Sequence, residues 1–77
     1  MKVTLKLARG IRELYERLDE EIEVSLKEGA KVKDALAAVG LPEGSWGILL
    51  NGERICRVDE EVSDGWIITV LPPVSGG

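Results

Sequence analysis

The chain of 77 residues has room for one domain, and a domain this small buries only about 60% of its unfolded surface, which leaves little space for an enzyme cleft beside a core. The net charge of -4 argues against a nucleic-acid partner, which needs clustered Lys and Arg, while 44% hydrophobic and 31% charged residues are typical of a globular chain. A single cysteine excludes an internal disulfide, and the lack of histidine removes the commonest metal ligand, so we expect no metal site. No apolar stretch approaches the roughly 18 residues of a membrane span, and the N-terminus lacks the apolar region of a signal peptide. We therefore expect a cytoplasmic protein.

The first third of the chain predicts two strands on either side of a short helical segment. Residues 2–7 (KVTLKL) alternate between apolar and polar side chains, which predicts a half-buried strand. Residues 8–20 (ARGIRELYERLDE) have helical spacing, but Gly10 and the short length predict only a turn or two of helix. Residues 21–27 (EIEVSLK) alternate again and predict a second strand, which forms a hairpin with the first.

The main helix is predicted after Lys31, where the hydrophobic period changes. Four apolar residues then fall at helical spacing and form one stripe: Val32, Ala35, Leu36 and Val39. Gly40 stands where a C-terminal cap belongs, and Pro42 cannot continue a helix.

The second half of the chain predicts three strands. Residues 46–50 (WGILL) and 53–58 (ERICRV) are expected to pair as a hairpin around Asn51-Gly52, a turn in which both central residues need positive φ. Residues 66–71 (WIITVL) predict the last strand, and Pro72-Pro73 ends it because proline has no N–H for the ladder.

The last strand is apolar at nearly every position, which is typical of a strand covered on both faces. One helix covers only one face of a sheet, however, so apolar residues of this strand must lie on the uncovered side. They are either Trp66, Ile68 and Val70 or Ile67, Thr69 and Leu71, because the sequence does not fix the register. An exposed apolar patch usually marks a protein partner. The candidate partner-interface residues are Trp66, Ile67, Ile68 and Leu71.

The order of elements, β-β-α-β-β-β with one main helix, predicts the α+β arrangement called the β-grasp or ubiquitin-like fold. We expect a mixed sheet of four to five strands packed on one helix. Residues 1–71 form the predicted domain, and residues 72–77 form a flexible, extended C-terminal tail that ends in Gly-Gly.

The tail has physical properties of its own. Pro72-Pro73 favours an extended backbone, and residues 72–77 reach about 20 Å at roughly 3.3 Å per residue. Gly76 and Gly77 lack a Cβ, so a narrow channel can close on their backbone. The α-carboxylate of Gly77 is the functional group at the tip, and a carboxylate needs activation before a nucleophile attacks it.

The chain resembles the small ubiquitin-like sulfur carriers, which are the small subunit of molybdopterin synthase and the related thiamine-biosynthesis sulfur carrier (ThiS/MoaD-like proteins). The segments that carry the resemblance are KVTLKLARGIREL, EGAKVKDALAAVGL, LLNGERI, VSDGW and LPPVSGG. The ending PPVSGG is more similar to the molybdopterin synthase subunit. Trp66 departs from the family, which usually carries an acidic residue after the turn glycine, and the segment near Tyr15 is lengthened.

The resemblance implies a carrier that is not itself an enzyme and binds no cofactor. An E1-like adenylating enzyme uses ATP to activate Gly77, and a cysteine desulfurase or rhodanese-type donor converts the adenylate to a thiocarboxylate. The tail then enters the large subunit of molybdopterin synthase and gives its sulfur to a pterin that will hold molybdenum or tungsten. Gly76 lets the tail pass, and four residues guide it: Pro72, Pro73, Val74 and Ser75.

Three alternatives remain open at this point. The chain could carry sulfur for thiamine thiazole synthesis, act as a ubiquitin-like modifier joined to other proteins through Gly77, or be a β-grasp interaction domain with an inert tail. Cys56 is expected to pack as a small hydrophobic residue rather than relay sulfur, because no cationic partner lies in a recognisable site beside it.

Overall fold

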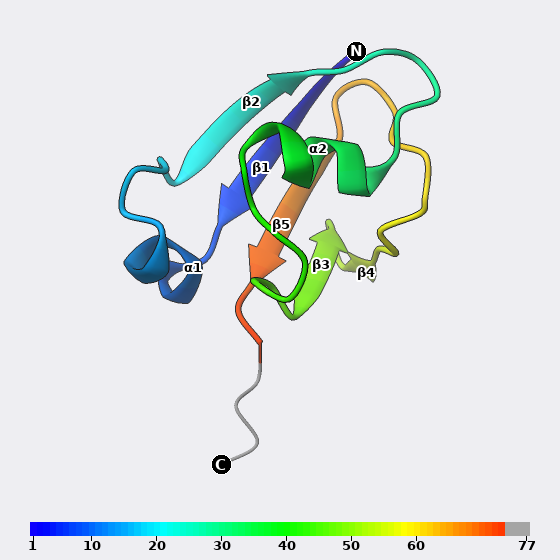
Figure 1. Ribbon diagram of the computed structural model, residues 1–77. Coiled ribbons are helices and arrows are strands. Elements are labelled where there is room, and N and C mark those ends of the chain that lie inside the picture. The colour runs from blue at the N-terminus through cyan, green and yellow to red at the C-terminus, as the bar shows by residue number, and fades with distance from the viewer. Residues whose placement is uncertain (74–77) are drawn as a thin grey trace.

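The computed structural model describes residues 1–73 as one mixed five-stranded sheet with two short helices (Figure 1). The elements in chain order are β1 (Lys2–Leu7), α1 (Arg9–Leu14), β2 (Glu21–Ser25), α2 (Val32–Ala38), β3 (Ile48–Asn51), β4 (Arg54–Ile55) and β5 (Ile67–Leu71). The strand order is β2-β1-β5-β3-β4, with β1 and β5 parallel and the other neighbours antiparallel. This arrangement confirms the predicted β-grasp fold.

The neighbouring strands β1 and β5 supply five of the fifteen buried core residues. Along β1 and β5 every second side chain is buried against α2, which crosses one face of the sheet (Figure 1). The fully buried residues of these strands and of α2 include Val3, Leu5, Ile68, Val70 and Val32. The opposite face, here called the outward face, carries the alternate residues of all five strands.

The helix α2 is short, and both of its ends are satisfied by neighbours. At the C-terminus Gly40 has φ +79°, and the N–H of Leu41 donates to the carbonyl of Leu36 at 3.1 Å, as in a Schellman motif. At the N-terminus the N–H groups of Val32 and Lys33 donate to carbonyls of residues 60 and 58, both at 2.9 Å. The segment between β4 and β5 therefore caps the helix.

This capping segment explains why β4 is shorter than predicted. A strand over residues 53–58 was expected, but the ladder ends at Ile55, because the chain then leaves the sheet edge to reach the start of α2. The prediction for Asn51-Gly52 is also wrong in detail. Asn51 pairs with Arg54 inside the ladder and has no positive φ, so the turn residues are 52–53 and Gly52 alone has positive φ, at +63°.

A bidentate ion pair holds the capping segment against the end of the hairpin. The guanidinium of Arg54 donates to both carboxylate oxygens of Glu60, at 2.9 and 2.8 Å, and lies 5.6 Å from the ring centre of Trp66. The hydrogen bond and charge of Arg54 lower the pKa of Glu60, and Glu60 raises the pKa of Arg54.

Replacing Glu60 by Gln should make stability less sensitive to acid. Folding lowers the pKa of Glu60, so the ion pair contributes its full stabilisation of the folded state at pH values above the ordinary Glu pKa of about 4.5. This stabilisation is lost as the pH falls through the folded-state pKa of Glu60. Urea unfolding from about pH 7 to about pH 3 should show the free-energy difference between wild type and Glu60→Gln shrinking in acid. The control Glu61→Gln leaves the pair intact, and a difference that stays constant down to the lowest pH contradicts the assignment.

The register of β5 predicts opposite consequences for two adjacent isoleucines. Ile68 is 0% exposed, so Ile68→Ala should lower the free energy of unfolding by about 2–5 kcal/mol. Ile67 is 45% exposed, so Ile67→Ala should cost about 1 kcal/mol or less. Urea titrations of the two variants measure both values, and equal losses would show that the register is wrong.

Candidate functional site

The last strand runs directly into the segment that carries the candidate reactive group. β5 ends at Leu71, as the two prolines predict, and Pro72 and Pro73 follow at the end of the sheet where α1 lies (Figure 1). Pro72 is half-buried and Pro73 is exposed. The remaining predicted tail residues, Val74, Ser75, Gly76 and Gly77, lie outside the residues that the structure describes.

The structure decides which side of β5 is uncovered. Ile67, Thr69 and Leu71 lie on the outward face, whereas Ile68 points into the core. The prediction of Ile68 as a partner-interface residue is therefore wrong, because alternation along the strand buries its side chain completely. Trp66 shares the core-side register and is half-buried beneath Arg54, so it is not part of the outward face either.

Neighbouring strands extend the exposed apolar surface beyond the predicted residues. Leu71 pairs with Ile48, and Leu50 pairs with both Thr69 and Ile55, which places these side chains on the same face. Ile55 is 65% exposed and Ile48 is 37% exposed. We call the following set the apolar half-face: Ile48, Leu50, Ile55, Ile67 and Leu71. The sequence signal for Ile55 is its alternation with the buried Cys56, but the β3–β5 register that brings Ile48 beside Leu71 is not visible in the sequence.

The other half of the outward face is charged and internally paired. Lys2 lies 3.2 Å from Glu23, and Lys6 lies 3.6 Å from Glu21, each pair joining β1 to β2. Exposed cross-strand pairs of this kind contribute little to stability but neutralise each other's charge. The apolar half-face is therefore the part of the sheet whose burial by a partner would release most free energy.

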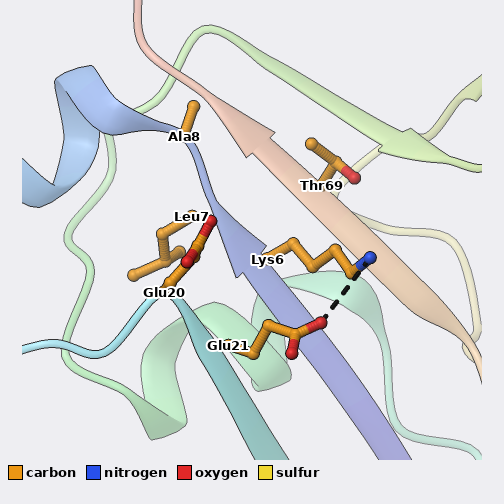
Figure 2. Close-up of a pocket in the computed structure, with 6 residues that line it drawn as sticks. All are labelled: Lys6, Leu7, Ala8, Glu20, Glu21 and Thr69. Atoms are coloured by element: carbon orange, nitrogen blue, oxygen red, sulfur yellow. Dashed lines mark ion pairs between the residues drawn. The ribbon is translucent and has the colours of Figure 1, made fainter.

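A hollow of about 430 Å³ lies among residues at the end of β1, residues at the start of β2 and Thr69 of β5. Figure 2 shows the Lys6–Glu21 ion pair beside Thr69 of β5, with Ala8 near the end of β1. None of the residues that line this hollow belongs to the apolar half-face.

The single thiol is not arranged for sulfur chemistry. Cys56 is buried, as predicted, and its Sγ lies 3.9 Å from the carbonyl oxygen of Arg54. Burial raises the pKa of the Cys56 thiol despite the nearby positive charge of Arg54, which disfavours the reactive thiolate. The expectation that this residue packs as a hydrophobic side chain is therefore supported.

Within residues 1–73, no cluster of three or more His, Cys, Asp or Glu side chains could hold a metal ion. Neither helix in the described part of the chain has the length and apolar character needed to span a bilayer.

Comparison with known proteins identifies relatives with the same fold over nearly the whole chain. The ThiS family model matches residues 6–77. A putative molybdopterin converting factor, subunit 1, from Pyrococcus furiosus is 28% identical, with a TM-score of 0.76 and coverage of 96% of this chain and 99% of that one.

Two more solved structures share the fold at lower identity. SAMP1 from Haloferax volcanii is 24% identical with a TM-score of 0.79, and each chain is covered fully. One chain in the structure of a complex of subunits 1 and 2 of molybdopterin-converting factor from Helicobacter pylori is 20% identical, with a TM-score of 0.66 and full coverage of both chains. The family match and the shared fold together place this chain in the ThiS family of ubiquitin-like sulfur carriers of the ThiS/MoaD type.

Proposed function

We propose that this chain is a sulfur carrier that acts through the carboxylate of Gly77 in molybdopterin synthesis. The proposal rests on the observation that the apolar half-face and the C-terminal tail meet at the end of β5. The apolar half-face ends at Leu71, and the segment that leads to Gly76 and Gly77 starts at the next residue. A partner that covers the apolar half-face is thereby placed beside the start of the tail.

The proposed chemistry takes place at one carbon atom. The Gly77 carboxylate attacks the α-phosphorus of ATP in an adenylating enzyme, pyrophosphate leaves, and an acyl-adenylate forms. The terminal sulfur of a donor persulfide then attacks the acyl carbon, the bond to AMP breaks, and an acyl disulfide forms. A second thiol attacks the donor's sulfur in this disulfide, so that the donor and the thiol become joined by a disulfide bond and the thiocarboxylate of Gly77 is released. After the sulfur has attacked the pterin precursor, water cleaves the acyl–sulfur bond and regenerates the carboxylate of Gly77.

The body of the protein supplies docking rather than catalysis in this proposal. An exposed apolar patch on a small domain marks a site of protein association, and the apolar half-face is bordered by paired charges that give such a patch a polar rim. The adenylating enzyme and the large subunit of molybdopterin synthase must each reach Gly77. We therefore propose that both cover this surface, one after the other.

The relatives favour the pterin pathway. The Pyrococcus furiosus relative is named as a putative molybdopterin converting factor subunit, and the Helicobacter pylori structure contains subunits 1 and 2 of such a factor. A second function is favoured by the similarity to SAMP1, since a related Haloferax volcanii structure is named small archaeal modifier protein 1. In that case Gly77 would be joined to amino groups of other proteins. A carrier role in thiamine thiazole synthesis is the third outcome to test.

Incubation with ATP, an adenylating enzyme and a sulfur donor should replace one oxygen of Gly77 by one sulfur. Intact mass spectrometry measures this change and also establishes the C-terminal residue of the mature protein. Deletion of Gly77 should abolish loading and leave urea unfolding unchanged, because β5 and the core end before the tail. Loading of the deletion variant would contradict the assignment of Gly77. Adducts to other chains would favour the modifier, and transfer of the sulfur to a thiazole rather than a pterin would favour the thiamine pathway.

Ile55→Glu should weaken binding to the large subunit by at least about tenfold without lowering stability much, because the side chain is 65% exposed. The matched control is Ser25→Glu, which adds the same charge to the other half of the outward face. Titration calorimetry with the unloaded chain gives the two dissociation constants. Equal effects of the two substitutions would show that charge alone matters and that the apolar half-face is not the docking surface.

A further inference from the structure

Pro72 is held between two glycines from different parts of the chain. A Cβ added at Gly10, in α1, would lie 2.9 Å from Cγ and 3.1 Å from Cβ of Pro72. A Cβ added at Gly47, in the loop before β3, would lie 2.7 Å from the carbonyl oxygen of Pro72 and 2.8 Å from Cα of Pro73. The shortest distance at each position is below 3.0 Å, closer than a real Cβ atom approaches, so a larger residue at either position would displace its neighbours.

Backbone conformation does not explain either glycine. Within residues 1–73 the glycines with positive φ are Gly29, Gly40, Gly44, Gly52 and Gly65, and neither Gly10 nor Gly47 is among them. Gly10 lies within α1, where glycine is an unfavourable helix residue. The close approach of Pro72 is thus the reason in this structure for a residue without a side chain at each position.

The same two segments also hold the strand that precedes Pro72. The N–H of Gly47 donates to the carbonyl of Leu71 at 2.8 Å, and the N–H of Ala8 donates to the carbonyl of Val70 at 3.0 Å. Leu71 and Pro72 are therefore fixed from both sides, whereas the next residue, Pro73, is exposed. We call Gly10 and Gly47 the proline seat.

We propose that Gly10 and Gly47 are positioning residues for the reaction at Gly77, an inference that rests on the sulfur-carrier function proposed above. The proline seat fixes the point and direction from which the last five residues start while the apolar half-face is docked on a partner. Five extended residues span about 17 Å at most, so a turn of about 10° at the seat moves the tip by about 3 Å. If these five residues are fully extended between the proline seat and a distant active site, they have no spare length to compensate for such a displacement.

The test compares Gly47→Ala and Gly10→Ala with Gly44→Ala in the full chain. Gly44 lies in the same loop as Gly47 and has φ +88°, but a Cβ there would meet nothing within 4 Å. Its substitution therefore introduces backbone strain without touching Pro72. Nuclear Overhauser effects between protons of Pro72 or Pro73 and those at positions 10 and 47 report whether the seat is occupied.

Steady-state adenylation by the adenylating enzyme supplies the functional measurement. We expect kcat to fall about 10- to 100-fold in Gly47→Ala and Gly10→Ala, since small misplacements of a reacting group have effects of this size. The KM for the carrier should change little, because the apolar half-face is intact. In Gly44→Ala, kcat should equal that of wild type once the fraction of folded protein is taken into account.

A double variant keeps the inference testable if Gly47→Ala does not fold. Pro72→Gly removes the ring that meets Gly10, so adding Gly10→Ala to it should cause no further loss of kcat. Additive losses would overturn the role of Gly10, and a wild-type kcat in Gly47→Ala with displaced prolines would overturn that of Gly47. Failure of the wild-type chain to be adenylated would instead overturn the proposed function, and the positioning role with it.

Discussion

A single main helix can cover only one face of a sheet, and this constraint determines what the other face must do. The side chains of β5 alternate, so Ile68 and Val70 enter the core under α2 while Ile67 and Leu71 face away from it. In a larger protein a second layer of helices would cover that surface. Here it remains open, next to the start of the tail, and this is the surface on which we propose that partner proteins dock.

The chain order and type of the elements could be predicted from the sequence because they depend on local patterns. Alternation identified β1 and β2, and the stripe that begins at Val32 identified α2 together with its cap at Gly40. Positions set by long-range contacts could not be predicted. The early end of β4 depends on carbonyl groups of residues 58 and 60 that satisfy the start of α2, and no local pattern carries that information.

In the candidate site, too, features set by local sequence could be predicted, and features set by long-range contacts could not. The Gly-Gly ending and the two prolines are visible in the sequence, and so is the surplus of apolar residues in β5. The outward set could not be assigned, because a shift of one residue in register exchanges all the side chains between the two faces. The proline seat was also missed, because Gly10 and Gly47 are far apart in the sequence and meet only when β5 is in place. A glycine inside a predicted helix was the one available hint.

The parallel pairing of β1 with β5 has a consequence for biosynthesis. The first strand of the chain is joined along the middle of the sheet to the last one, so a nascent polypeptide has no central pair until residues 67–71 have left the ribosome. Closure of such a long loop comes late in folding and opposes early compaction. A truncated translation product therefore lacks both the core of Ile68 and Val70 and the continuous surface made by Leu71 with Ile48. If the apolar half-face is the docking surface, as proposed above, a partner binds only chains whose synthesis has passed β5.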